Sequence, residues 1–273
     1  TTREYMNLGG KGVNVSRVLT NLEVPNVALG FVAGFTGDAL RNGLERMGVK
    51  TDFISLEEGN TRINVNIKGI EETDINARGP EIPNSAIDEL FKKLDNLQSG
   101  DTLVLAGSIP TSLPNDMYER IMERLYGKGI RFVVDATRDL LVKSLKYEPF
   151  LIKPNNHELG EIFGLELTKD NEIIYYAREL KKQGAKNVLI SMAGDGAILV
   201  DENDVAHKIG TPKGKVKNSV GAGDSMVAGF CAGYLEKGDY KYALRMGTAA
   251  GSASAFSESL ATKQEVIDLL NKI

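Results

Sequence analysis

The most informative segment for chemistry is residues 218–225, with the sequence NSVGAGDS. Its Gly-Ala-Gly run lets the backbone turn its N–H groups toward one point at the start of a predicted helix. Such a nest stabilises negative charge on a phosphoryl group during transfer. Asp224 lies at the mouth of this helix, where it could accept a proton from a hydroxyl group. Simple capping of the helix explains Asp224 equally well, because aspartate commonly has that role.

A second glycine-rich segment, residues 9–17 (GGKGVNVSR), places backbone N–H groups and the cation of Lys11 at the start of another predicted helix. This arrangement suits an anion or a polyhydroxylated ligand, and Asn14 could face the same ligand from one turn further on. The segment is not a Walker loop, because Gly12 stands where Ser or Thr would bind magnesium. Nor is it a dinucleotide fingerprint, because Val15 occupies the third glycine position. A plain turn remains the alternative.

Residues 153–158 (KPNNHE) follow an apolar run and supply a third group of polar side chains. Asn155 and Glu158 stand at the carboxyl end of a predicted strand, where α/β sheets bind ligands. An amide and a carboxylate suit a hydrated Mg²⁺ ion, because magnesium keeps several of its waters. Locally, however, the spacing favours a capping box, with Asn155 as the N-cap and Glu158 three residues later.

Three further segments are weaker candidates. Residues 191–196 (SMAGDG) separate two apolar runs and could be a hairpin turn. Residues 106–110 (AGSIP) end another run in small residues that leave room for a ligand. Arg62 could clamp a phosphate with its guanidinium fork, although taken alone it is more simply a solvated surface arginine.

The elements that must position these residues alternate between short apolar runs and stretches of helical periodicity. This alternation predicts βαβ units and an α/β fold with a doubly wound, mainly parallel sheet flanked by helices. The predicted strands are residues 26–33, 101–106, 129–135, 149–153, 187–191 and 196–201, and the predicted helices are 38–47, 84–97, 115–126, 155–163 and 171–182. Three more helices, at 223–235, 240–256 and 263–271, are expected to cover the sheet.

Residues 61–68 and 72–76 break this alternation. Their polar alternation predicts a β-hairpin that turns at Gly69, with residues 1–7 as a candidate third strand. A small sheet outside the main fold is a candidate lid, and an ordinary edge hairpin is the alternative. We therefore expect a core of residues 8–58 and 80–273 and a β-lid of residues 1–7 and 59–79.

Composition limits the class of protein. The 273 residues include 33 Lys+Arg and 37 Asp+Glu, for a net charge of −4, with 42% hydrophobic residues, as in soluble globular proteins. The mild acidity and the lack of a basic stripe argue against nucleic acid as a partner. No apolar run approaches the roughly 18 residues of a membrane span, and no secretory signal is recognised. With one cysteine, Cys231, and two histidines, we expect no disulfide, no Cys/His metal centre and a cytoplasmic location.

Residues 9–17, 153–158 and 220–225, in this order, resemble the signature motifs of the ribokinase-like sugar kinases of the phosphofructokinase B family. The resemblance covers nearly the whole chain, and three ordered motifs on an α/β pattern make coincidence improbable. Within the family, residues 10–12, 61–64 and 107–110 resemble the hexose-phosphate kinases. Residues 2–17 and 71–80 are most similar to the 1-phosphofructokinase subgroup.

The resemblance implies phosphorylation of D-fructose 1-phosphate to fructose 1,6-bisphosphate with ATP and Mg²⁺. Tagatose 6-phosphate and fructose 6-phosphate are the alternative substrates. It implies that Asp224 is the general base and that the amides of Gly221, Ala222 and Gly223 form an anion hole. The implied sugar-phosphate contacts are Gly9, Gly10, Lys11, Asn14, Arg62 and Ser108. The implied nucleotide contacts are Lys153, Asn155, Ser191, Gly194, Gly196, Val220 and Ser252, with Asn155 and Glu158 organising Mg²⁺ through water.

The resemblance also implies a homodimer that forms through the lid. The sequence departs from the family pattern at one point. Family members usually begin with a strand that carries an Asn-Pro-x-x-Asp segment, whose aspartate binds sugar hydroxyls, and no such strand precedes Gly9. We therefore keep a second hypothesis, a catalytically weak binder of sugar phosphate or nucleotide, and we expect an uncovered sheet edge.

Overall fold

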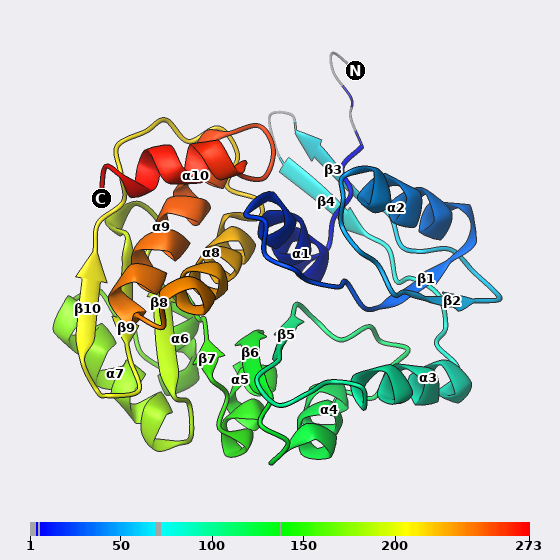
Figure 1. Ribbon diagram of the computed structural model, residues 1–273, viewed down its shortest axis with the longest axis horizontal. Coiled ribbons are helices and arrows are strands. Elements are labelled where there is room, and N and C mark those ends of the chain that lie inside the picture. The colour runs from blue at the N-terminus through cyan, green and yellow to red at the C-terminus, as the bar shows by residue number, and fades with distance from the viewer. Residues whose placement is uncertain (1–3, 5, 69–71, 137) are drawn as a thin grey trace. The chain divides into compact units, whose positions relative to one another are not determined.

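The computed structural model describes residues 4, 6–68, 72–136 and 138–273 (Figure 1). The chain divides into two compact units. Unit 1 comprises Thr1–Leu8, Val27–Leu97 and Ile109–Met117, and unit 2 comprises Gly9–Asn26, Gln98–Ser108 and Tyr118–Ile273. The expected division into a core and a β-lid concerns function and stays a prediction.

Unit 2 contains a six-stranded sheet in the order β10-β9-β8-β7-β6-β5. Strands β5 to β8 are parallel, whereas β9 is antiparallel to β8 and β10 is antiparallel to β9. The middle strands are almost wholly buried, which explains their continuous apolar sequence. The strands are β5 (Thr102–Ala106), β6 (Arg131–Asp135), β7 (Leu151–Ile152), β8 (Asn187–Ser191), β9 (Ala197–Val200) and β10 (Ala206–Ile209).

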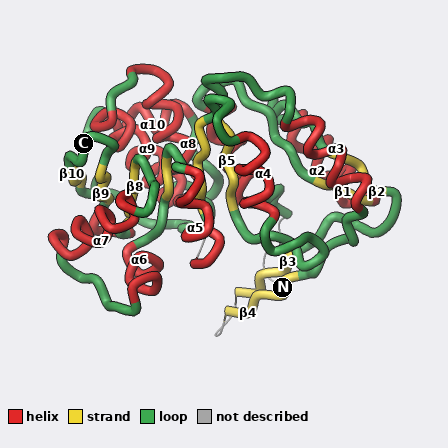
Figure 2. Tube along the Cα trace, turned by 90° about the horizontal axis from the view of Figure 1, so that it is seen from below, coloured by secondary structure: helices red, strands yellow, loops and turns green. Residues whose placement is uncertain are grey.

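Helices cover both faces of this sheet, and Figure 2 shows the layers from below. Helices α8, α9 and α10 lie on one face and α5, α6 and α7 on the other. The helices of this unit are α1 (Lys11–Asn21), α5 (Arg138–Ser144), α6 (Asn156–Phe163), α7 (Asp170–Lys182), α8 (Ala222–Lys237), α9 (Tyr240–Phe256) and α10 (Lys263–Leu270), and α4 (Met117–Leu125) belongs to it except for its first residue. Two short 3₁₀ turns, η1 (Leu145–Tyr147) and η2 (Ala193–Asp195), complete the unit.

The helix pair α8 and α9 forms the centre of the core, together with α1 and residues of the sheet. Small residues let the two backbones approach closely. A Cβ atom on Gly229 would stand 2.6 Å from the carbonyl oxygen of Met246, and one on Gly247 would stand 2.8 Å from that of Met226. Tight contact with α9 therefore fixes the position of α8, including its N-terminal end.

Unit 1 contains a two-stranded parallel sheet and a separate antiparallel hairpin. In the hairpin, Asn64 pairs with Asn76 and Lys68 with Glu72. The sequence predicted this hairpin, but its first strand begins at Asn64 rather than at residue 61. The predicted turn at Gly69 lies outside the described residues. Most of the candidate third strand is also undescribed, and Glu4, Met6 and Asn7 do not lie in a strand. The elements are β1 (Phe31–Ala33), α2 (Gly34–Arg46), β2 (Ile54–Leu56), β3 (Asn64–Lys68), β4 (Glu72–Asn76) and α3 (Asn84–Leu94).

The structure corrects the predicted elements in a few places. The strand expected at residues 26–33 is confined to β1, preceded by an isolated bridge between Ala28 and Thr51. Strands β2 and β10 and helix α5 were not predicted, because each is too short for a clear periodic signal. Among the described residues, no helix is both long and apolar enough to cross a membrane.

Candidate active site

The N-terminus of α8 is open. Its N-cap, Gly221, has φ 80°, a left-handed conformation that glycine adopts without strain, and it has no side chain to cap the helix. Within the described part of the chain, the amides of Gly221 and Gly223 donate no hydrogen bond, while the amide of Ala222 donates to the carbonyl of Ser219 at 3.2 Å. Two of the three predicted anion-hole amides are therefore unpaired, and the third is already engaged.

Asp224 is the third residue of α8, and its side chain does not cap the helix. Only 6% exposed, it accepts a hydrogen bond from Nδ2 of Asn14 at 2.8 Å through its Oδ2 atom. Burial raises the pKa of the Asp224 carboxyl, the hydrogen bond from Asn14 opposes this rise, and the negative charge of Asp135 adds to it. A carboxylate with a raised pKa is a stronger base, as proton removal from a hydroxyl group requires.

The glycine-rich segment of residues 9–17 leads into α1, which packs against α8. Gly10 is its N-cap with φ 117°, and Lys11 and Asn14 lie in the first turn of the helix. The Lys11 stem lies against the end of β5, since a Cβ atom on Gly107 would stand 3.7 Å from it. The fold thus places two predicted substrate ligands, Lys11 and Asn14, beside the proposed base.

Asp135 is a candidate site residue that the sequence did not single out. It ends β6, is 2% exposed, and its two carboxylate oxygens lie 3.4 Å from Nζ of Lys11 and 3.3 Å from Nζ of Lys153. A signal was present, because Asp135 stands at the carboxyl end of a predicted parallel strand, where ligands bind in such sheets. Asp135 becomes a candidate only in the structure, where Lys11 and Lys153, from two separate motifs, both lie beside its carboxylate.

Lys153 connects this ion pair to the open helix end. It follows β7, is buried, and its Nζ atom lies 3.4 Å from the point where a Cβ atom on Gly223 would stand. A cation and two unpaired amides therefore face the same small region. Such an arrangement stabilises the negative charge that develops on a phosphoryl group during its transfer.

Asn155 and Glu158 form the capping box that was the favoured local interpretation. Oδ1 of Asn155 accepts from the amide of Glu158, and Oε2 of Glu158 accepts from the amide of Asn155, both at 2.8 Å. Each side chain therefore uses one oxygen atom to accept a hydrogen bond at the start of α6. Their contact with Mg²⁺ stays a prediction.

The other predicted nucleotide contacts occupy varied positions in unit 2. Ser191 ends β8 and forms a parallel bridge with Asn155, while Gly194 lies in η2. Gly196 has a structural reason to be glycine, because its φ is 94° and a Cβ atom would stand 2.0 Å from the carbonyl oxygen of Ile209. Val220 is 70% exposed beside the start of α8, and Ser252 is buried in α9.

The remaining predicted sugar-phosphate contacts are Gly9, Ser108 and Arg62. Gly9 and Ser108 are exposed in unit 2, next to the start of α1 and the end of β5. Arg62 is exposed in unit 1, before β3. The structure therefore brings together Lys11, Asn14, Lys153 and the start of α8, and the role of Arg62 stays a prediction.

Comparisons with known proteins identify the family of the chain. The model of the pfkB family carbohydrate kinases matches residues 3–266. A 1-phosphofructokinase of Bacillus subtilis is 46% identical over 97% of this chain and 87% of its own length. A D-tagatose-1-phosphate kinase of Bacillus licheniformis is 40% identical over 95% of this chain and 85% of its own length. The crystal structure of a candidate phosphofructokinase from Staphylococcus aureus has a TM-score of 0.91 and 40% identity, over 99% of this chain and 88% of that one.

The chain belongs to the pfkB family of carbohydrate kinases. It is accordingly a phosphotransferase with an alcohol group as acceptor. The predictions of the family and of a ribokinase-like α/β fold with a small accessory sheet are confirmed.

Proposed function

We propose that the protein transfers the γ-phosphoryl group of ATP to a free hydroxyl group of D-fructose 1-phosphate, giving fructose 1,6-bisphosphate and ADP. The observation that carries this proposal is the buried Asp224 carboxylate at the open N-terminus of α8, flanked by unpaired amides and by Lys153. The substrate is chosen by analogy with relatives named 1-phosphofructokinase, among them the Bacillus subtilis protein.

In this proposal, Asp224 accepts the proton of the attacking hydroxyl group. Asn14 holds the carboxylate by one oxygen and leaves Oδ1 available for that proton. The amides of Gly221 and Gly223, together with the Lys153 ammonium, stabilise charge on the phosphoryl group as it moves. Lys11 binds the phosphate of the sugar, and Arg62, from the segment before β3, is assigned to the same phosphate.

Magnesium would shield the phosphate charges of ATP. The donor set fits a hydrated ion: Glu158 keeps Oε1 outside its capping box, and the described residues contain no group of three or more His, Cys, Asp or Glu side chains that could enclose a metal. Magnesium commonly takes one or two carboxylates and completes its shell with water and substrate phosphates. We assign Glu158 and Asn155 to this ion through water.

The preferred sugar is decided by comparing kcat/KM for fructose 1-phosphate, tagatose 1-phosphate, tagatose 6-phosphate and fructose 6-phosphate at fixed ATP and Mg²⁺. Tagatose 1-phosphate enters because of the Bacillus licheniformis relative, whereas the sequence-based alternative was the 6-phosphate. We expect the highest kcat/KM for fructose 1-phosphate. A higher value for any of the other three sugars would overturn the choice of substrate, and ATP binding without turnover of any of them would favour the weak-binder hypothesis.

We also propose that the protein acts in the cytoplasm as a homodimer formed through its hairpin. Val65 and Ile67 in β3 and Ile75 in β4 are all about half exposed, and Val65 pairs directly with Ile75. Side chains two residues apart on a strand, or paired across two strands, share a face. A second copy could cover this apolar face, and sedimentation of the active protein as a monomer would contradict the dimer.

A further inference from the structure

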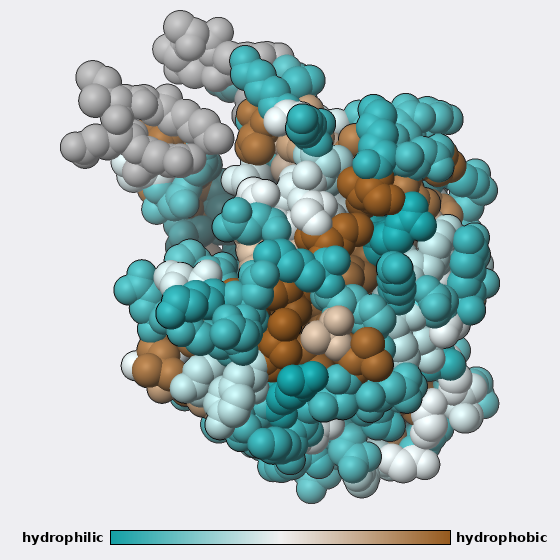
Figure 3. All heavy atoms as spheres, turned by 90° about the vertical axis from the view of Figure 1, so that its left-hand side faces the viewer, coloured by the Kyte–Doolittle hydropathy of each residue, from teal (hydrophilic) through white to brown (hydrophobic). Residues whose placement is uncertain are grey.

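A cavity of about 530 Å³ lies in unit 2 between β10 and α9. Figure 3 shows this side of the molecule, with hydrophobic side chains reaching the surface between hydrophilic ones. Ile209 of β10 and Leu244 of α9 provide an apolar floor, and both pack into the main core. The volume is in the range of small-molecule sites. None of the residues in the proposed active site lines it.

Four basic residues line the cavity, and no acidic side chain does so among the described residues. This lining contrasts with the whole chain, whose net charge is −4. Two of the four are on β10, His207 and Lys208, and two are on α9, Lys241 and Arg245. Since Lys241 and Arg245 are four residues apart, they lie on the same face of the helix.

The existing bonds of these groups show which of them can receive a ligand. Lys208 forms an ion pair with Asp170 of α7 and is thereby neutralised. Arg245 donates from Nε and Nη2 to main-chain oxygens of Leu270 and of Ile273, which also lines the cavity. These bonds orient the guanidinium and leave Nη1 unused among the described residues. Lys241 is exposed and makes no ion pair within the described part of the chain.

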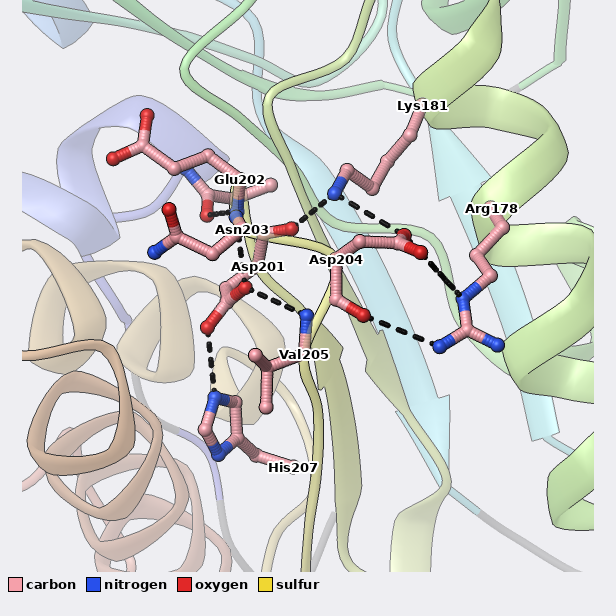
Figure 4. Close-up of polar contacts among 9 residues, drawn as sticks. Arg178, Lys181, Asp201, Glu202, Asn203, Asp204, Val205 and His207 are labelled. Atoms are coloured by element: carbon pink, nitrogen blue, oxygen red, sulfur yellow. Dashed lines mark hydrogen bonds and ion pairs between the residues drawn. The ribbon is translucent and has the colours of Figure 1, made fainter.

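His207 is held in place by a network at the β9–β10 turn (Figure 4). Its Nε2 atom lies 2.8 Å from Oδ2 of Asp201, and the other oxygen of Asp201 accepts from the amides of Asn203 at 3.0 Å and Val205 at 2.9 Å. Asp201 is itself buried. Figure 4 shows Nδ1 on the side of the ring away from Asp201, so this nitrogen stays available to a ligand.

We propose that this cavity binds a small organic phosphate. Its phosphate group would take hydrogen bonds and charge from Lys241 and Nη1 of Arg245, and from Nδ1 of His207 when both ring nitrogens carry a proton, because Nε2 already donates to Asp201. Its carbon skeleton would lie on Ile209 and Leu244. Arg245 is held by Leu270 and Ile273, and His207 by Asp201, so these two groups are preorganised, whereas the exposed Lys241 side chain is ordered only on binding. Preorganised donors bind an anion without a further ordering cost. This site is independent of the sugar that the kinase uses.

The test is isothermal titration calorimetry with phenyl phosphate, which joins a phosphate to an apolar ring, with phenol and inorganic phosphate as the two separate halves. We expect one site for phenyl phosphate and weaker binding of either half. Lys241→Glu should raise the Kd at least tenfold. Lys92→Glu is the matched control, because it makes the same charge change on an exposed lysine of α3 in unit 1 and should leave the Kd unchanged.

Binding at the kinase site is distinguished with Lys11→Met, which removes the proposed phosphate ligand there. We expect Lys11→Met to bind phenyl phosphate as the unmodified protein does. Far-ultraviolet circular dichroism checks that each variant is folded. An unchanged Kd in Lys241→Glu, or loss of binding in Lys11→Met, would overturn the proposal.

Discussion

Helices α6 and α8 carry an acidic residue at the same position, the third of the helix, and use it in opposite ways. In α6, Glu158 bonds back to the amide of Asn155, and Asn155 caps the amide of Glu158. In α8, the N-cap is Gly221, and Asp224 bonds to Asn14 of another helix. One helix end is thereby closed, and the other keeps unpaired amides.

The residue at the N-cap makes the difference. Asn155 in α6 and Thr262 in α10 each have a side chain that completes a capping box with the acid three residues later. Gly221 has none, and although the amide of Ala222 bonds to Ser219, the amides of Gly221 and Gly223 remain available to an anion. An acidic residue in the first turn of a helix is therefore a candidate catalytic residue only where the N-cap residue has no side chain with which to form a capping box.

The sharpest test of this comparison is Asp224→Asn against Glu158→Gln. Loss of a general base lowers kcat by about 10²–10⁴-fold, so we expect Asp224→Asn to reduce kcat on this scale while KM for the sugar phosphate changes little. Glu158→Gln keeps a capping box, because glutamine can also accept from the N-cap amide, and should leave kcat within about tenfold. Steady-state kinetics on the preferred sugar phosphate measure both.

Although we expect Asp224→Asn to lower kcat, we do not expect it to lower the stability of the fold. The pKa of Asp224 in the folded state lies above the ordinary value that the carboxyl has in the unfolded chain. Between these two values the folded state binds more protons, so the free energy of unfolding falls as pH rises through that window and stays lower at neutral pH. Asparagine removes this cost, so the Tm should stay the same or rise. A fall in Tm, or kcat that survives the substitution, would contradict the assignment.

Asp135 gives a second comparison, between two buried aspartates of one site. Removing one partner of a buried ion pair strands the other charge and costs about 3 kcal/mol. We expect Asp135→Asn to lower the free energy of unfolding on this scale, because Lys153 is buried beside it. Urea unfolding at neutral pH measures the change.

The control is the double variant Asp135→Asn, Lys153→Met, which also removes the stranded ammonium. It should recover part of the lost stability, since no uncompensated charge remains in the interior. Equal stability of Asp135→Asn and the unmodified protein would show that this ion pair does not hold the site together.

The sequence predicted most of the fold of unit 2, because buried parallel strands are continuous apolar runs that stand out from amphipathic helices. The elements that the sequence did not predict are short or partly exposed, so they lack such a continuous apolar run. Strand β10 is a four-residue edge strand with two exposed and two half-exposed side chains, and β2 has only three residues. Such elements exist because a neighbouring strand pairs with them, which is tertiary information.

The candidate site was predictable where its chemistry lies in one segment, as at the start of α8. It was not predictable where the chemistry arises from convergence. Asp135 is a single aspartate at the end of a strand, and its importance comes from Lys11 and Lys153, which lie 124 and 18 positions away in the sequence. The local capping box of Asn155 and Glu158 was correctly favoured for the opposite reason, since all its partners are within three residues.

The smallest expected effect is the loss of an N-cap side chain at the start of α6, where the capping box is complete. Loss of an N-cap side chain costs about 1 kcal/mol, so Asn155→Ala in α6 and Thr262→Ala in α10 should lower the free energy of unfolding by similar amounts. Of these two residues, Asn155 alone is assigned to ATP and Mg²⁺. Asn155→Ala, but not Thr262→Ala, should therefore raise the KM for ATP and the Mg²⁺ concentration needed for half-maximal rate. Urea unfolding and kinetics over a range of Mg²⁺ concentrations measure these quantities. If the two variants lose stability equally and keep equal KM values for ATP, Asn155 is a cap and nothing more, and the nucleotide must be held by other groups.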